Sequence, residues 1–435
     1  MVEASKMRVL YFAPKECWPP DTGAKLRNYH LARALSREAH VTYLAFADNA
    51  AGEASSSEGD PAGWCEQVVT VPLERGYTLS KLARGALGRT PVTVLNYTTR
   101  AMAAELERIL GAHEFDVVQV ESVHLAAYLP LIRAARGRPA VVCDWHNIES
   151  DLMRQYAGRT ANALRRAYAR RTASQLAALE RRTAREADTN VTCSEPDRER
   201  LLAFAPGARA HVVENGVDTD YYSDEQVGRA YEVWRSRRAD SGGDVSSGGD
   251  ARRRRILFVG SMDYHANVDG AVEFARETWP RVSESLPDLV LTIVGRNPAP
   301  EVRALAELRG VEVTGTVEDV RPYYREALAS VVPLNVGGGS RLKIYETLAA
   351  GVPVISTRLG AEGVETGGGE SIVYAETPEE FCRAINDIAR DERRWAELAA
   401  NGRRAVAERY DWATLGARLS EIHRGLLKER KSALS

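Results

Sequence analysis

The hydrophobic pattern of the chain alternates between short, continuous apolar runs and longer segments whose apolar residues recur at helical spacing. The first run is Met7–Ala13, and Leu31 and Leu35 lie four positions apart in the segment after it. Continuous apolar runs are typical of strands in a parallel sheet, because helices cover both faces of such a sheet. The order of strand, loop, helix and strand predicts a doubly wound α/β fold, in which ligands bind at the carboxyl ends of the strands.

The alternation continues along the chain and predicts two series of strands. With 435 residues, the chain exceeds what one hydrophobic core usually supports, so we expect two domains. The first series of predicted strands comprises residues 7–13, 40–45, 68–71, 115–121, 140–143, 189–193 and 210–213. The second series comprises residues 256–260, 289–295, 311–320, 331–334 and 352–355.

Composition and charge narrow the class of protein. Apolar residues make up 44% of the chain and charged residues 27%, as is ordinary for a soluble globular protein. The formal net charge of −2 gives no electrostatic reason to expect a nucleic-acid partner. The five cysteines show no CxxC spacing, so neither a zinc site nor a disulfide framework is predicted. No apolar run approaches the ~20 residues that span a bilayer, and we expect a cytoplasmic protein.

A strand, a glycine run and a helix follow one another in the last third of the chain. The apolar run 331–334 predicts a buried strand, and Ser340 opens the helical segment. Glycines between a strand and a helix let backbone N–H groups approach a ligand at the positive end of the helix. We therefore expect a phosphate-binding loop that consists of Gly337, Gly338, Gly339 and Ser340.

Two cations and one acid lie at the start of this helix. Arg341 and Lys343 occupy its first turn, where positive charge opposes the helix dipole unless an anion is bound. Glu346 follows in the next turn. This placement favours a binding function, and the structural alternative is an ordinary βαβ unit that ends on a glycine cap.

At these residues the chain resembles the retaining glycosyltransferases of family 4, which have the GT-B fold. This fold consists of two Rossmann-like doubly wound domains that face each other across a deep cleft. The resemblance implies that Arg341 and Lys343 bind the diphosphate of a sugar nucleotide and stabilise it as it leaves, and that Glu346 binds the ribose. It also implies that the loop containing Val317 accepts the nucleotide base against its backbone.

Two positions depart from the family pattern. Many members carry a glutamate where this chain has Gly338, which leaves the identity of the transferred sugar open. The first loop of the second domain, which begins at Gly260 and is expected to contact the donor, has Ser261 and Asn267 where many members have an arginine and a lysine. The negative charge of the donor still needs partners, so this departure increases the importance of Arg341 and Lys343.

The resemblance also implies the domain boundaries. Residues 1–214 are expected to form the Rossmann-like acceptor-binding domain, and residues 215–410 the domain that binds the sugar nucleotide. A helix at about 411–430 is expected to cross back onto the first domain. Residues 235–255 are rich in glycine, serine, aspartate and arginine, and we expect them to be a disordered insertion on the surface.

Polar residues at strand ends of the first domain are the candidates for the acceptor side. Gly23 and Lys25 belong to a loop that resembles a family-4 motif after the first strand. Glu121 closes the fourth predicted strand, where a carboxylate can deprotonate an acceptor hydroxyl or simply cap a helix. His146 and Asn147 follow the fifth strand, and a lone histidine is also often structural. Either Glu121 or His146 is predicted to act on the acceptor.

The region 154–187 is helical and rich in arginine. A basic amphipathic helix can lie on anionic lipid, and several family members act on lipid-linked acceptors. The acids Glu180 and Glu186 reduce the positive charge of this region, so a solvated helix is the alternative. Peripheral contact with the inner face of a membrane is therefore left open.

The sequence as a whole predicts a metal-independent, retaining glycosyltransferase that uses a UDP-, GDP- or other nucleoside-diphosphate sugar and no further cofactor. Its acceptor is a small molecule, a glycan or a lipid-linked compound. Two alternatives remain, a sugar-nucleotide 2-epimerase of the same architecture and a non-catalytic sugar-nucleotide-binding protein. The nucleotide base, the sugar, the acceptor, the pathway and the oligomeric state are not specified by the sequence.

Overall fold

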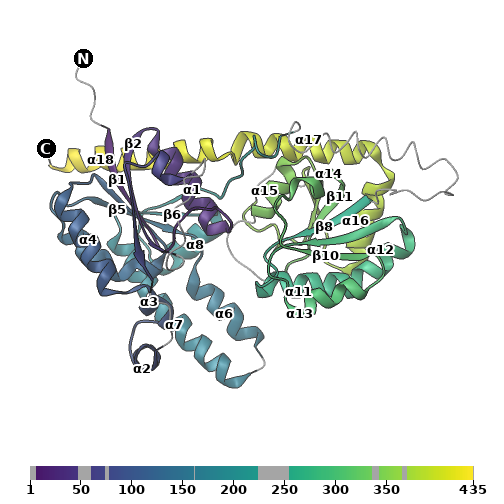
Figure 1. The fold of residues 1–435 in the computed structure, drawn as a ribbon, viewed down its shortest axis with the longest axis horizontal. Coiled ribbons are helices and arrows are strands. Elements are labelled where there is room, and N and C mark those ends of the chain that lie inside the picture. Colours follow the sequence, from purple (N-terminus) through teal and green to yellow (C-terminus); the bar gives the residue numbers. More distant parts are fainter. Residues whose placement is uncertain are drawn as a thin grey trace, which may run out of the picture. The chain divides into compact units, whose positions relative to one another are not determined.

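The computed structural model describes residues 6–47, 60–73, 78–160, 162–223, 254–335, 342–364 and 370–434. The chain divides into two compact units. Unit 1 comprises Met1–Asn215 and Trp412–Ser435, and unit 2 comprises Gly216–Asp411. Figure 1 shows that each unit is a sheet with helices on both sides.

Unit 1 contains a seven-stranded sheet with the order β3-β2-β1-β4-β5-β6-β7. Its strands are β1 (Met7–Ala13), β2 (Ala39–Ala47), β3 (Gln67–Pro72), β4 (Val117–Glu121), β5 (Ala140–Trp145), β6 (Thr189–Thr192) and β7 (Ala210–Val212). All neighbouring strands pair in parallel. The carboxyl ends of the strands therefore lie at one edge of the sheet, where a doubly wound fold binds its ligands.

The helices of unit 1 connect these strands in chain order. They are α1 (Gly23–Ser36), α2 (Leu79–Leu87), α3 (Val92–Tyr97), α4 (Arg100–Ala112), α5 (Leu129–Ala134), α6 (Glu149–Arg159), α7 (Ala163–Glu186), α8 (Glu195–Phe204) and α18 (Trp412–Leu434). The arginine-rich region thus forms two helices, α6 and α7. Helix α18 packs against α1, and the rings of Trp412 and His30 stack with centroids 5.0 Å apart.

The two faces of this sheet differ in chemistry because side chains alternate along each strand. Val118 and Val120 of β4 belong to the apolar core that also contains residues of α4 and α7. Gln119 and Glu121 therefore lie on the other face, and Gln119 contacts His423 of α18 there. This face carries the polar residues of the candidate site.

Unit 2 contains a six-stranded parallel sheet with the order β10-β9-β8-β11-β12-β13. Its strands are β8 (Arg254–Val259), β9 (Leu289–Val294), β10 (Val311–Gly315), β11 (Ala327–Val332), β12 (Val354–Ser356) and β13 (Ile372–Tyr374). Its helices are α11 (His265–Glu273), α12 (Trp279–Ser285), α13 (Pro300–Arg303), α14 (Arg321–Arg325), α15 (Leu342–Ala349), α16 (Pro378–Arg390) and α17 (Glu392–Arg409).

Local sequence signals explain where several of these helices begin and end. Thr377 and Glu380 form a capping box at the start of α16. Helix α15 ends at Ala349, and Gly351 in the turn after it has a φ of +70°, in the left-handed region that glycine adopts without strain. The N–H of Val352 donates to the carbonyl oxygen of Thr347 at 3.1 Å, which is the bonding pattern of a Schellman motif. This turn directs the chain into β12.

The predicted fold class is confirmed, because both sheets are parallel and both units are doubly wound. One part of the sequence interpretation is wrong, because Arg254 and Arg255, assigned to a disordered insertion, belong to β8. Arg255 donates to Glu326 at 2.9 Å and to Thr292 at 2.7 Å, and also contacts Glu312. The rest of that segment lies outside the described residues. All five cysteines are free, as predicted.

Candidate active site

Glu121 and His146, predicted as alternative acceptor-side residues, form a pair in unit 1. Glu121 ends β4 and is fully buried, while His146 follows β5 and has a side chain 14% exposed. Their Oε2 and Nε2 atoms lie 2.7 Å apart. The neighbouring strands bring them together, because Glu121 lies opposite Asp144 in the register of β4 and β5.

The polar surroundings of Glu121 favour its ionised form. Burial alone would raise the pKa of this carboxyl, but the hydrogen bond and charge of His146, the charge of Arg27 and the hydrogen bond from Gln119 together hold it below its ordinary value. The Nε2 of Gln119 donates to Glu121 Oε1 at 2.7 Å. Both carboxylate oxygens therefore have a donor.

Arg27 and Asp144 form a second buried pair beside the first. Arg27 lies on α1, and its Nε and Nη2 donate to both oxygens of Asp144 at 2.8 to 3.2 Å. Their side chains are 1% and 0% exposed. Burial raises the pKa of Asp144 to about 6 against the opposing effect of Arg27, so the carboxylate is still ionised at pH 7. No pattern in the sequence singles out Arg27, since a charged residue in a helix after a loop is usually solvated.

Arg27 also holds the chain at the point where unit 1 ends. Its Nη1 donates to the carbonyl oxygen of Glu214 at 3.0 Å and to Asn215 Oδ1 at 3.1 Å. The Glu214 side chain in turn pairs with Arg418 of α18. One guanidinium therefore links the candidate site at the end of β5 to the segment where the chain leaves this unit.

The ligand atoms of Glu121, Asp144 and His146 lie within 4.8 Å of one another, which is close enough to hold a cation. The donor set does not leave room for one. Both oxygens of Asp144 accept from Arg27, and both oxygens of Glu121 lie within hydrogen-bond distance of Gln119 or His146. The guanidinium supplies the positive charge that a metal ion would bring, so these residues fit an ion-pair network better than a metal centre.

The other predicted acceptor-side residues lie at the same edge of the sheet. Gly23 is the first residue of α1, after β1, and the Oγ1 of the capping Thr22 accepts from the N–H of Lys25 at 3.3 Å. The Lys25 Nζ lies 3.3 Å from Asp21. Asn147 follows His146 and is half-buried. The structure places Gly23 and Lys25 beyond β1, whereas Glu121 and His146 lie beyond β4 and β5.

In unit 2, three of the predicted donor-side residues come together where β8 ends. The Lys343 Nζ donates to Asn267 Oδ1 at 2.7 Å, and Asn267 Nδ2 donates to the carbonyl oxygen of Ser261 at 2.9 Å. A Cβ atom at Gly260 would lie 2.8 Å from Asn267 Nδ2 and 2.9 Å from Lys343 Nζ. Glycine is therefore required for this close approach.

Arg296 joins the same group from the neighbouring strand. It follows β9, and its Nε donates to Ser261 Oγ at 2.9 Å. The sequence shows Arg296 only as the residue after a strand, and no spacing connects it with Ser261. The structure thus adds a second described cation to the strand ends that hold Gly260 and Lys343.

Glu346 lies on α15 three residues after Lys343, and therefore on the same helix face. Burial raises the pKa of Glu346 to about 7, and the charge of Lys343 opposes this rise only in part. Val317 follows β10 and packs against the core of unit 2. The remaining predicted donor residues, Gly337, Gly338, Gly339, Ser340 and Arg341, lie outside the described residues.

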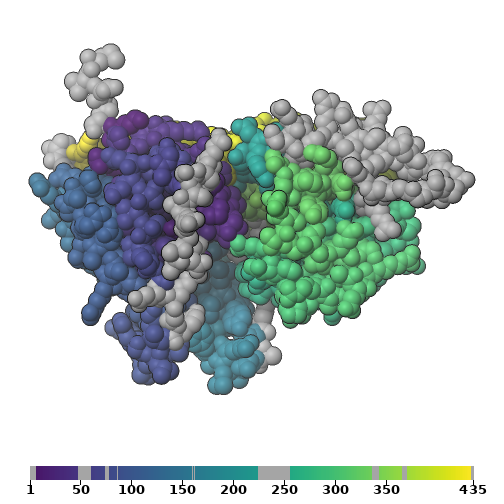
Figure 2. Space-filling model, in the orientation of Figure 1, coloured from purple at the N-terminus to yellow at the C-terminus, as the bar shows by residue number. Residues whose placement is uncertain are grey.

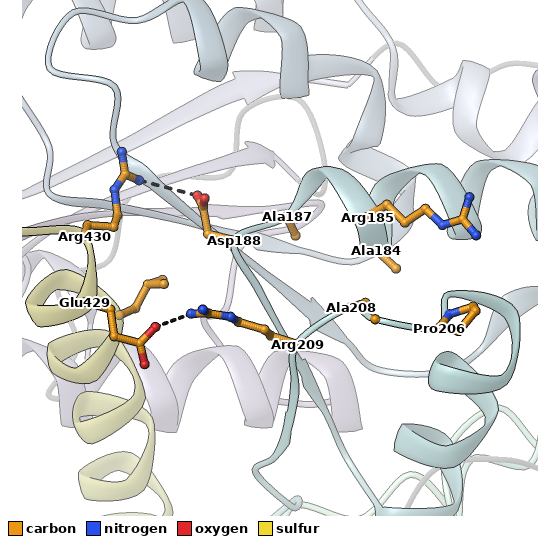
Figure 3. Close-up of a pocket in the computed structure, with 11 residues that line it drawn as sticks. Ala184, Arg185, Ala187, Asp188, Pro206, Ala208, Arg209, Glu429 and Arg430 are labelled. Atoms are coloured by element: carbon orange, nitrogen blue, oxygen red, sulfur yellow. Dashed lines mark hydrogen bonds and ion pairs between the residues drawn. The ribbon is translucent and has the colours of Figure 1, made fainter. Parts of the chain in front are cut away.

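A pocket with a volume of about 580 Å³ lies at the opposite edge of the unit 1 sheet, where β6 and β7 begin (Figure 3). Four of its charged residues form two pairs, since Arg209 contacts Glu429 and Arg430 contacts Asp188. The predicted acceptor-side residues all lie at the carboxyl edge, so this pocket is separate from the candidate site.

Comparisons with known proteins show the family of the chain. The family model described as Glycosyltransferase Family 4 matches residues 22–221, and the model described as Glycosyl transferases group 1 matches residues 253–391. A GDP-mannose-dependent alpha-(1-6)-phosphatidylinositol monomannoside mannosyltransferase of Mycolicibacterium smegmatis is 26% identical over 78% of this chain and 84% of its own length.

Solved structures show the same fold. The sucrose-phosphate synthase of Thermosynechococcus elongatus superposes with a TM-score of 0.67 at 17% identity, over 98% of this chain and 100% of that chain. Anabaena Alr3699/HepE in complex with UDP-glucose gives a TM-score of 0.62 at 15% identity, over 96% and 100%. The fold is that of the GT-B glycosyltransferases.

Because the two family models together match most of the chain, it belongs to the family 4 glycosyltransferases. It is therefore an enzyme that uses a nucleotide-sugar donor. The comparisons do not favour the epimerase or the non-catalytic binding protein considered above.

Proposed function

We propose that this enzyme transfers a sugar from a nucleoside-diphosphate sugar to an acceptor hydroxyl with retention of anomeric configuration and without a metal ion. The observation that carries the proposal is the placement of Lys343 and Glu346 on one helix face, with the Lys343 ammonium beside Gly260. The cation can bind the diphosphate and the carboxylate can accept from the ribose hydroxyls, while Gly260 leaves room for the ammonium.

Cations of the chain take the part that a metal ion plays in other phosphate sites. Lys343 donates a hydrogen bond to Asn267. Arg296, which follows the neighbouring strand, donates one to Ser261. As the bond between the anomeric carbon and the phosphate oxygen breaks, negative charge grows on the diphosphate, and a fixed ammonium stabilises it more than it stabilises the bound donor. Activity in the presence of a chelator tests this part of the proposal.

On the acceptor side, His146 is better placed than Glu121 to take the proton of the attacking hydroxyl. Glu121 is fully buried and both of its oxygens have partners, whereas the His146 side chain is 14% exposed. Glu121 then orients the imidazole and stabilises its protonated form. Front-face attack by the hydroxyl, with departure of the diphosphate from the same face, gives retention.

The relatives suggest which donors to test first. The mycobacterial relative is named as GDP-mannose-dependent, and the Anabaena structure contains UDP-glucose. We propose a hexose donor of this kind and a glycan or lipid-linked acceptor. A thermal-shift screen over nucleotide sugars identifies the donor, because a ligand at ~100 times its dissociation constant stabilises the folded state by about 2.7 kcal/mol.

The reaction is then assayed with that donor by release of nucleoside diphosphate, with and without EDTA. The anomeric configuration of the product is read from its proton NMR coupling constants. We expect transfer with retention that EDTA leaves unchanged. An inverted product contradicts retention, and loss of transfer in EDTA that added metal restores contradicts metal independence.

We also propose that unit 1 touches an anionic membrane through α2 and the amino-terminal half of α7. The large hydrophobic side chains that are at least half exposed in the described part of the chain all lie on these two helices, and they are Leu79, Leu87, Leu164 and Tyr168. Figure 2 shows this region at the surface of unit 1. Residues 78–90 and 162–179 contain seven lysines and arginines and no acid, so the apolar groups are surrounded by positive charge.

Three hydrogen bonds from two side chains of α7 join α2 and α7 into one surface. Gln175 Nε2 donates to the carbonyl oxygens of Gly85 and Gly88 at 2.7 and 2.9 Å, and Arg171 donates to Gly88 at 3.0 Å. Among the described residues, no helix is long and apolar enough to cross a membrane. The proposed contact is peripheral, through the apolar side chains and the surrounding cations of this surface.

Sedimentation with vesicles tests this surface. We expect binding to vesicles of phosphatidylcholine and phosphatidylglycerol that is weaker with pure phosphatidylcholine and weaker in a Leu79→Ser, Leu87→Ser variant. Leu308→Ser, at an exposed leucine of unit 2, is the matched control. Equal binding of the double variant and the control would exclude this surface as the contact.

A further inference from the structure

We infer that His423, on the last helix of the chain, is a positioning residue for the acceptor-side base, and that it acts through Gln119 and Glu121 on His146. The inference rests on the proposed role of His146 in transfer. None of the patterns in the sequence singles out His423, which lies 304 positions from the residue it contacts.

The four side chains form one continuous hydrogen-bonded chain through the interior of unit 1. His423 Nε2 lies 2.8 Å from Gln119 Oε1, Gln119 Nε2 lies 2.7 Å from Glu121 Oε1, and Glu121 Oε2 lies 2.7 Å from His146 Nε2. His423, Gln119 and Glu121 are all completely buried. No solvent reaches these groups to offer an alternative partner.

The ionised carboxylate fixes the direction of every proton in this chain. Glu121 can only accept, so the amide nitrogen of Gln119 must face it and the amide oxygen must face His423. His423 must then donate through Nε2–H. At the other end, His146 must also donate through Nε2–H, which leaves its Nδ1 with the lone pair that accepts a proton.

His423 has an electrostatic environment that matches this role. Burial lowers its pKa to about 4, so the ring is neutral, and the Gln119 oxygen that Nε2 faces requires the single proton to be on Nε2. Its Nδ1 is buried and has no hydrogen-bond partner among the described residues. An apolar side chain of similar size would avoid this unsatisfied atom, so the structure tolerates an unfavourable group in order to keep one donor in place.

In the described part of the chain, the other groups around Glu121 do not donate to the Gln119 oxygen as His423 does. Arg27 from α1 and Asp144 from β5 bind each other, while burial and the charges of Glu121 and Asp144 raise the pKa of Tyr11 on β1. Without His423, the buried Gln119 oxygen has no donor, and the amide can move away from its hydrogen bond with Glu121. The carboxylate then loses a donor and its fixed orientation, and His146 loses the partner that selects its tautomer.

Three variants separate positioning from packing. His423→Leu removes the donor and keeps the volume, whereas His423→Gln keeps an N–H that can reach Gln119. Leu419→Ala loosens the same helix one turn earlier, at a fully buried position outside the chain of hydrogen bonds. The melting temperature, kcat and KM for both substrates are measured for each, together with the ¹⁵N spectrum of histidine-labelled protein, with the His146 signal assigned from His146→Gln.

We expect His423→Leu to keep its melting temperature and its donor KM while kcat falls by at least about 10-fold, a share of the 10²–10⁴ that a positioned base contributes. The His146 signal should lose the Nε2–H pattern. His423→Gln should restore most of kcat, and Leu419→Ala should lower the melting temperature with kcat unchanged. An unchanged kcat and His146 signal in His423→Leu would overturn the inference. The ¹⁵N spectrum does not depend on activity. It therefore tests whether His423 controls the tautomer of His146 even if the protein transfers no sugar.

Discussion

Lys343 and Asn267 of unit 2 are joined by a hydrogen bond of 2.7 Å that passes directly beside Gly260. The glycine has no side chain, and a methyl group there would lie within 3 Å of both polar atoms. The Lys343 ammonium and the Asn267 amide therefore reach the carboxyl end of β8 only because Gly260 has no side chain there.

Gly260→Ala is predicted to impair the donor site rather than the fold. The atoms that the new methyl group meets are the far ends of flexible side chains, which can shift and lose their mutual position. We expect weaker nucleotide-sugar binding and lower kcat with little change in melting temperature. Gly425→Ala, where a Cβ atom meets nothing within 4 Å, is the control. Wild-type kinetics in Gly260→Ala would show that the donor site does not need Lys343 and Asn267 to lie this close to residue 260.

Donor binding is predicted to depend on pH through Glu346, whose pKa burial raises to about 7. The ribose hydroxyls need the ionised carboxylate as acceptor, so affinity is full above pH 7 and falls by up to about tenfold per pH unit below it. A nucleotide sugar is the ligand to titrate, because its diphosphate does not change protonation in this range. Glu346→Gln should flatten the profile between pH 5.5 and 8, roughly the range in which this group titrates. If donor affinity falls with the same slope in Glu346→Gln, the pH dependence belongs to another group.

Removing Arg27 is predicted to destabilise unit 1 strongly. Arg27→Met leaves Asp144 as an unpaired buried charge, which costs about 3–5 kcal/mol. Burial already raises the pKa of Asp144, so lowering the pH toward 5 protonates the stranded carboxyl and should recover part of the loss. Denaturant unfolding at both pH values measures this. The exposed Arg33→Met should change stability by no more than about 0.5 kcal/mol.

Substitution of His146 is predicted to remove transfer and to spare donor binding. His146→Ala deletes the proposed proton acceptor, so kcat should fall by about 10²-fold or more. Initial rates combined with calorimetric titration of the donor separate the two effects. The exposed His113→Ala serves as the comparison. Normal transfer by His146→Ala would move the acceptor-side role to Glu121, to the donor phosphate or to another group.

The strands could be predicted from the sequence because burial on both faces gives continuous apolar runs. Met7–Ala13 is both the predicted and the observed first strand, whereas β8 begins with Arg254 and Arg255, which composition alone assigned to an insertion. Arg255 is stabilised in β8 by hydrogen bonds to Glu326 and Thr292. These residues lie far along the chain and meet Arg255 only in the folded sheet. Local composition could not show those contacts.

The candidate site was predictable only where its residues are close in sequence. Lys343 and Glu346 share a helix turn, so their charges could be interpreted together. The pairing of Glu121 with His146 depends on the register of two strands, and the burial of Arg27 depends on a partner 117 positions away. Arg296 likewise reaches Ser261 in unit 2, and His423 reaches Gln119 in unit 1, from distant elements. Such contacts follow from tertiary packing rather than from motif spacing.

The central claim is that Lys343 and Glu346 form the donor site, and paired measurements on Lys343→Ala and Glu346→Ala test it most directly. Calorimetric titration of nucleoside diphosphate and initial rates are compared with wild type and with Lys428→Ala, an exposed lysine of α18.

Glu346→Ala should weaken nucleotide binding by about 1.5–3 kcal/mol, because a charged hydrogen-bond acceptor is lost from the bound state. Lys343→Ala should lower kcat more than affinity, because its charge matters most as the diphosphate leaves. Unchanged affinity in Glu346→Ala together with unchanged kcat in Lys343→Ala would contradict the account.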